Sequence, residues 1–153
     1  MKIKQNFKKR FFQGLIATII LISLVAISPF IIFPILNSIE AAKLARTVQN
    51  KELPEKTAIV EVISGVGNIA GTGNNTSLWA GMLIKTELTE EEICSFYHHN
   101  NVQKVDERNK RTSIMFLVSS DFHALENISV YDGYYIVEWT DDAVSSFFDL
   151  RGH

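Results

Sequence analysis

Residues 57–97 read "TAIVEVISGVGNIAGTGNNTSLWAGMLIKTELTEEEICSFY", and this stretch decides the fold class. Its first part, "TAIVEVIS", alternates with a period of two and is rich in β-branched residues, which predicts a strand over Thr57–Ser64. The alternation divides the side chains between two faces, one with Ile59, Glu61 and Ile63 and the other with Ala58, Val60 and Val62. A second strand is predicted over "SLWAGMLIK", Ser77–Lys85.

A helix is predicted directly after the second strand. Thr89 is its N-cap and Glu92 stands at the third helical position, which together make a capping box. Its apolar stripe is predicted to consist of Ile93, Phe96 and Tyr97. Cys94 is predicted to be buried or half-buried in this helix, because free cysteine behaves as a small apolar residue.

The rest of the chain after Tyr97 is predicted to supply further strands. They are expected around Val102–Val105, over "TSIMFLVSS" (112–120), near Ile128–Tyr131 and over "YYIVEWT", Tyr134–Thr140. Asp132–Gly133 is a hairpin-turn signal. The tail Asp141–His153 fits either a short helix or a packed coil. One helix on a mainly antiparallel sheet makes residues 53–153 a small α+β domain.

The chain before this domain is dominated by an apolar run. Residues 11–36 carry no charge, and at about 1.5 Å per residue they form a helix of roughly 39 Å, longer than the ~30 Å hydrocarbon core of a bilayer. This predicts a transmembrane signal anchor. Pro29 and Pro34 are expected to kink or end the helix near the outer interface. Residues 37–52 are predicted to form a juxtamembrane helix or stalk.

Charge is distributed unevenly about the apolar run. Residues 1–10 form a basic segment without acidic residues, whereas all 17 acidic residues lie from Glu40 onward. By the positive-inside rule, the N-terminus is predicted to be cytoplasmic and the C-terminal domain extracytoplasmic, with the chain crossing the cell membrane once. The alternative is a signal peptide cleaved near "SIEAAKLA", although the apolar run is longer than the usual h-region of a signal peptide.

The four glycines at positions 65, 67, 71 and 73 raise the question of a phosphate-binding loop. Their spacing matches neither the dinucleotide fingerprint nor the P-loop, and the residues after Asn75 predict a strand, whereas a phosphate loop leads into a helix. No nucleotide is therefore expected to bind here. Two interpretations stay open: a connection between two paired strands, or a partner-binding loop that uses Gly71, Gly73, Asn74 and Asn75.

No residue is predicted to be catalytic, to bind a cofactor or to ligate a metal. The residues that come nearest to a catalytic site are Asp121 and His123, beside Ser119 and Ser120, but no nucleophile-elbow motif accompanies them. A metal site built from Asp121, His123 and either His98 or His99 lacks a ligand-spacing motif. Because the exported part is acidic, no nucleic acid is expected as a partner.

The succession "LPEKTAIVEVISGVGNIAGTGNNTSLWAGMLIKTELTEEEICSFY", Leu53–Tyr97, follows a basic N-terminus and one apolar span, and the chain closes with "FFDLRGH". In these features it resembles a group of uncharacterised small single-pass membrane proteins of Gram-positive bacteria. The resemblance implies a bacterial envelope setting. It brings with it no activity, substrate or catalytic residue.

Three functions are consistent with these patterns. The favoured one is a membrane-anchored extracytoplasmic binding module without catalysis, whose partners are the lipid bilayer and a membrane or envelope protein. The second is a small exported hydrolase or metal-dependent enzyme centred on Asp121 and His123. The third is a regulatory subunit that acts through its transmembrane helix.

Overall fold

The computed structural model describes residues 2–68, 76–97, 101–106, 122–144 and 146–152. In chain order, its elements are α1 (Lys2–Ile27), α2 (Pro29–Gln49), β1 (Thr57–Gly67), β2 (Ser77–Thr86), α3 (Glu90–Phe96), β3 (Asn101–Lys104), α4 (His123–Glu126), β4 (Tyr134–Asp142) and the 3₁₀ turns η1 (Ser146–Phe148) and η2 (Leu150–Gly152). Within these ranges four strands form one antiparallel sheet in the order β1-β2-β4-β3. A long apolar helix followed by an antiparallel sheet confirms the predicted α+β class.

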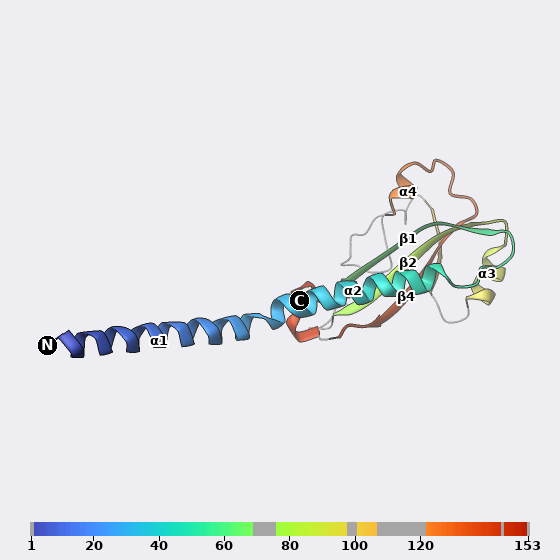
Figure 1. Ribbon diagram of the computed structural model, residues 1–153. Coiled ribbons are helices and arrows are strands. Elements are labelled where there is room, and N and C mark those ends of the chain that lie inside the picture. The colour runs from blue at the N-terminus through green and yellow to red at the C-terminus, as the bar shows by residue number, and fades with distance from the viewer. Residues whose placement is uncertain (1, 69–75, 98–100, 107–121, 145, 153) are drawn as a thin grey trace.

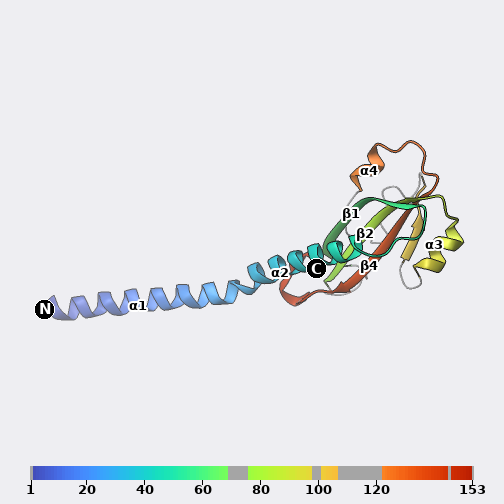
Figure 2. The ribbon, with the colours of Figure 1, turned by 45° about the vertical axis from the view of Figure 1, so that its right-hand side comes forward.

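Helices α1 and α2 form one extended rod with a slight bend between them, and the sheet lies beside α2 only (Figures 1 and 2). The rod stays helical through the bend because the Ser28 amide donates to the Leu24 carbonyl at 3.0 Å. Pro29 is the first residue of α2, where its missing N–H costs nothing, and Pro34 lies inside α2 without ending it. Arg10–Gln49 is long and apolar enough to cross a membrane, judged by length and composition.

The second half of α2 packs on the sheet. Val48 is fully buried and Ala41 is only 3% exposed. Leu44 and Ala45 are partly buried against the same core cluster as Val48. The segment that we expected to be a stalk is indeed helical, but it covers one face of the sheet and belongs to the core of the domain.

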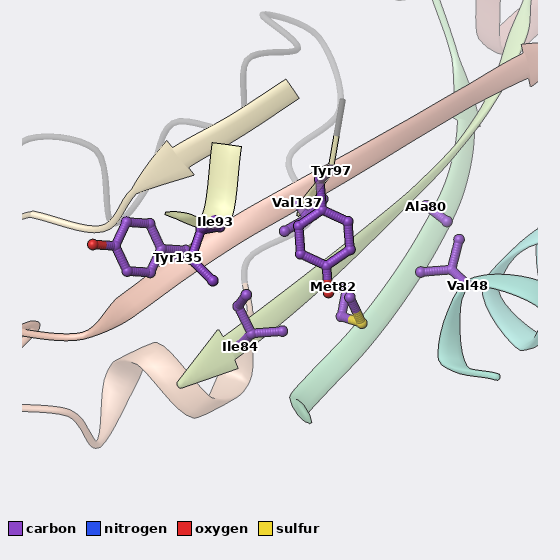
Figure 3. Close-up of a cluster of buried hydrophobic side chains, with 8 residues drawn as sticks. All are labelled: Val48, Ala80, Met82, Ile84, Ile93, Tyr97, Tyr135 and Val137. Atoms are coloured by element: carbon purple, nitrogen blue, oxygen red, sulfur yellow. The ribbon is translucent and has the colours of Figure 1, made fainter. Parts of the chain in front are cut away.

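The core on this face joins both helices to the two central strands. Figure 3 shows Val48 of α2 and Ile93 of α3 directed toward side chains of β2 and β4. The buried members of this cluster are Val48, Ala80, Met82, Ile84, Ile93, Tyr97, Tyr135 and Val137. Since α2 and α3 pack on the same face, two helices cover it where the sequence predicted one.

A second cluster lies on the opposite face of the sheet. Its buried members are Leu83, Val105, Phe122, Leu125 and Ile136. Strand β2 therefore contributes to both clusters, with Met82 in the first and Leu83 in the second. This explains why β2 is a nearly continuous apolar run: side chains on both of its faces are buried.

A β-bulge in β1 corrects the predicted faces of that strand. The pairing with β2 shifts between Ile59 and Glu61, so Val60 has no partner residue in the ladder. One extra residue reverses the alternation beyond it. Ile59 and Val62 consequently pack on the first cluster and Ile63 on the second, while the Glu61 carboxylate accepts a hydrogen bond from the Ala124 amide at 2.9 Å. The prediction that Ile59, Glu61 and Ile63 share one face was wrong.

Helix α3 begins as predicted. The Thr89 hydroxyl accepts from the Glu92 amide at 3.3 Å, and the Glu92 carboxylate accepts from the Thr89 amide at 2.8 Å, which completes the capping box. Ile93 and Tyr97 are buried, but Phe96 is 41% exposed and Cys94 is also exposed. Two predictions were therefore wrong: that Phe96 belongs to the buried stripe, and that Cys94 is buried or half-buried. The reason is that α3 ends at Phe96 and only one face of so short a helix contacts the sheet.

The other strand predictions had mixed outcomes. Strands β3 and β4 confirm those around residues 102–105 and 134–140, whereas Ile128–Tyr131 is not a strand and follows the short helix α4. Asp132–Gly133 forms a turn immediately before β4, with Gly133 at a φ of 75°. The strand predicted over 112–120 lies outside the described residues. The tail contains the two 3₁₀ turns η1 and η2 and folds back toward α2.

Candidate functional site

Buried polar groups gather where the C-terminal tail meets α2. Among the described residues, buried polar or charged side chains occur at six positions: Asn37, Asn68, Thr76, Thr86, Glu138 and Asp149. Three of these, Asn37, Thr76 and Asp149, are joined by hydrogen bonds although they come from α2, the start of β2 and the tail. We call the set of Asn37, Thr76, Asp149 and Arg151 the junction.

Asp149 is the centre of the junction and is fully buried. Its carboxylate accepts a hydrogen bond from the Asn37 side-chain amide at 2.8 Å, and its backbone carbonyl accepts one from the Thr76 hydroxyl at 3.2 Å. The Asn37 side-chain oxygen in turn accepts from the Val144 amide at 2.9 Å. A buried amide and a buried carboxylate thus satisfy each other, as buried polar groups must if the fold is to be stable.

Arg151 neutralises Asp149 and ties the tail to α2. Its Nε and Nη2 atoms donate to the two carboxylate oxygens of Asp149 at 2.8 and 2.6 Å, the bidentate geometry that is strongest for such a pair. The remaining donors of Arg151 reach α2, with Nη1 donating to the Ser38 hydroxyl at 2.9 Å and Nη2 to the Pro34 carbonyl at 2.7 Å. One guanidinium therefore connects the tail to a full turn of the helix.

Aromatic rings extend the contact toward the bend between α1 and α2. The ring of Phe148 stacks on Phe33 with centroids 5.3 Å apart and meets Phe30 edge-on, also at 5.3 Å. Phe147 packs edge-on against Phe148 at 5.1 Å. The tail is thus held to α2 by a polar contact at Asn37 and an aromatic contact at Phe33, about one turn apart.

The pKa of Asp149 is set by two opposing effects. Burial raises it, but hydrogen bonds from the Arg151 and Asn37 side chains favour the charged form and outweigh burial, so that the pKa lies below the usual value of 3.8. A carboxyl group with a lowered pKa stabilises the folded state fully above its ordinary pKa. That contribution is lost as pH falls through the lowered value.

We therefore expect Asp149→Asn to destabilise the full chain near neutral pH by roughly 1.5–3 kcal/mol, the usual contribution of hydrogen bonds to a charged group. The difference between variant and parent should shrink once the pH falls below 3.8, because the carboxyl group is then protonated in the unfolded chain, and it should vanish as the pH falls through the lowered pKa of the folded chain. Denaturant unfolding in detergent micelles at several pH values measures this. Asp142→Asn, at an exposed position at the end of β4, is the matched control and should leave the free energy of unfolding near neutral pH almost unchanged.

An apolar groove of about 670 Å³ lies beside the junction, between α2 and the tail. Its lining residues are Phe30, Pro34, Ile35, Ser38, Ile39, Ala42, Asp149, Leu150 and Arg151. The polar groups at its edge, Ser38, Asp149 and Arg151, already bond to one another or to α2. The groove therefore offers mainly apolar contact.

Of the predicted site residues, only His123 lies in the described part of the structure. Gly71, Gly73, Asn74 and Asn75 lie outside the described residues, as do His98, His99 and the serines and aspartate at 119–121. Thr76 directly follows the glycine segment in sequence, and its hydroxyl donates to the Asp149 carbonyl. The strands on either side of it, β1 and β2, pair antiparallel, in agreement with a loop that connects two strands.

His123 begins α4 with an exposed side chain, on the opposite face of the sheet from α2. Within the described ranges, no group of three His, Cys, Asp or Glu side chains is placed to hold a metal ion. The arrangement at the junction binds and orients chain segments. Its carboxylate and guanidinium neutralise each other, and the neighbouring Ser38 hydroxyl donates to the Pro34 carbonyl at 2.9 Å.

Sequence analysis missed the junction. The available signals were an Asp and an Arg two residues apart, at positions 149 and 151, after a pair of phenylalanines, and Asn37 as the first amide after the apolar run. None of these signals specifies a partner at a sequence separation of 112 residues. No family model, curated protein or solved structure matches the chain.

Proposed function

We propose that the chain is a single-pass membrane protein whose extracytoplasmic α+β domain binds a partner at the membrane surface without catalysing a reaction. One observation carries this proposal. The helix that is apolar enough to cross a membrane continues into the core of the domain, where Val48 is fully buried. The domain is then held in a fixed orientation close to the bilayer, as suits a module that presents a surface to another membrane or envelope protein.

Retention of the anchor is supported by the position of the alternative cleavage site. Cleavage within Ala42–Ala45 would cut α2 between two buried residues, Ala41 and Val48. It would also release Asn37 and with it the hydrogen bond to Asp149. A signal peptide is normally dispensable for the mature fold, whereas this segment contributes to the core.

The orientation is supported by the basic segment 1–10 and the acidic remainder of the chain. The lone cysteine gives a direct test, because Cys94 is exposed on α3. In intact cells, a membrane-impermeant maleimide is expected to label Cys94 without permeabilisation. In a Cys94→Ser chain that carries Gln5→Cys, labelling should require permeabilisation. The reverse pattern would refute the proposed orientation.

Partner binding is tested by photo-cross-linking in native membranes. A photoreactive residue at Asn74, in the segment proposed to contact a partner, is expected to yield one defined adduct. The same residue at Glu126, exposed on α4, is the control and should yield none. If neither position gives an adduct, the partner-binding loop is rejected, and the hydrolase centred on Asp121 and His123 becomes the leading alternative.

A regulatory role is the second candidate, and the continuity of the rod favours it. Because α1 leads into α2, and α2 packs on both β1 and β2, a tilt or rotation of the span would displace the sheet as well. A partner that binds the span could in this way alter the outer surface, provided that it binds the two arrangements with different affinity.

A further inference from the structure

The tail exposes large apolar side chains beside the helix that is proposed to cross the membrane. Phe147 is 68% exposed and Leu150 is 66% exposed, although each has a neighbour, Phe148 or Asp149, that is packed against α2. Exposed apolar side chains of α2 continue this surface, among them Ile35 at 55% and Ile39 at 47%. Together Phe147, Leu150 and Ile35 form what we call the collar.

The collar lies at a predictable depth relative to a bilayer. Arg10 marks the inner end of the apolar run, and about 20 helical residues cross the ~30 Å hydrocarbon core, so the span from Phe11 ends near Phe30. The next turn, to about Ile35, crosses the outer interfacial layer, which is about 5–7.5 Å thick on each side of the core. Phe148 contacts Phe30 and Phe33, and this contact places the tail at the same level.

The charge of the tail is compatible with this depth. Its charged side chains after β4, Asp149 and Arg151, form a bidentate ion pair and so carry no net charge into the interface. The Arg151 side chain is 40% exposed, so it remains accessible to lipid headgroups. Phe and Leu side chains are typical of the apolar face of segments that lie in the membrane interface.

From these observations we infer that the collar inserts into the outer leaflet, with Phe147 and Leu150 at the boundary between headgroups and acyl chains. The inference rests on the proposed function, because it requires the span to lie in a membrane. It explains why the apolar run is longer than one bilayer crossing needs: the surplus at its outer end belongs to a second, lateral contact with lipid.

Site-specific fluorescence in reconstituted vesicles tests the inference. In the full chain with Cys94→Ser, single cysteines are introduced as Phe147→Cys, Val130→Cys and Leu21→Cys, and each is labelled with an environment-sensitive fluorophore. The three native side chains are similarly exposed, at 68%, 69% and 62%. The vesicles are dioleoylphosphatidylcholine, with spin-labelled lipid carrying its label near either the carbonyl or the methyl end of the acyl chain.

The label at residue 147 is expected to lose most of its emission to lipid labelled near the carbonyl end and little to aqueous iodide. The label at residue 130 should be quenched by iodide only. Quenching of residue 147 by iodide alone would overturn the inference, as would protection from both quenchers, which would indicate cover by a second protein copy. The label at residue 21 separates the two proposals. If lipid does not quench this label, the membrane span itself is refuted. If lipid quenches the label at residue 21 but not the label at residue 147, only the insertion of the collar is refuted.

Discussion

A chain that begins at Lys51 is expected not to fold, whereas a chain that begins at Pro29 should unfold cooperatively. The shorter chain loses α2, and with it Val48 and Ala41, which are 0% and 3% exposed. Burial of a side chain of the size of Val48 contributes about 1.5–3 kcal/mol. The apolar sheet residues beneath α2 would be exposed as well, and each of them would lose part of a similar contribution. The sum approaches the ~5–15 kcal/mol that stabilises a whole domain.

Thermal melts followed by circular dichroism in mild detergent would measure this difference. Val48→Asp in the full chain should have a similar effect, because it places an unpaired charge in the first core cluster. Thr47→Asp, on the exposed side of the same turn, is the matched control and should melt like the parent. A cooperative transition in the chain that begins at Lys51 would show that the fold does not require α2 and that this helix is only a stalk between the membrane and the domain.

Trp79→Ala is expected to give the largest loss among single truncations, about 3–5 kcal/mol, because Trp79 is 1% exposed and is among the largest fully buried side chains. Its indole lies over Gly65, the residue opposite it in β1, where an added Cβ would stand 2.6 Å from Nε1. Gly65→Val should therefore also destabilise, by about 1–3 kcal/mol. Denaturant unfolding of the full chain in micelles would measure both effects.

The double variant makes this prediction sharper. With Trp79→Ala in place, the valine of Gly65→Val can occupy part of the vacated space. The double variant should therefore lose less unfolding free energy than the sum of the losses in the two single variants. Val130→Ala, at a position that is 69% exposed, is the control and should be nearly neutral. Full additivity would mean that the indole and Gly65 do not contact each other as described.

Much of the fold was predictable because local chemistry specifies it. The capping box at Thr89 and the β-strand that begins at Thr57 depend on neighbouring residues only, and both predictions were confirmed. The faces of β1 beyond Val60 were not predictable, since a bulge depends on how the partner strand pairs. Phe96 is exposed although its spacing from Ile93 fits the apolar face of a helix. This spacing does not determine where α3 ends on the sheet, and the helix ends at Phe96.

The candidate site was predictable to a much smaller extent. The membrane-spanning potential of residues 11–36 follows from composition alone and does not depend on the fold. The junction depends on contacts between Asn37 and Asp149, which no periodicity or motif connects. The glycines raised the question of a phosphate-binding loop, but Gly65 is explained by the close approach of the Trp79 side chain and requires no ligand.

The hydrogen bond between Asn37 and Asp149 also has a consequence for the order of folding. It joins residues 112 positions apart, so it closes a loop that contains the entire sheet. Loop closure of this length is entropically unfavourable until the intervening strands have paired. During synthesis α2 leaves the ribosome before the strands, and the tail leaves it after them. The contact can therefore form only after residue 149 has emerged, and a chain truncated before this residue would keep α2 without the hydrogen bond that fastens the tail to it.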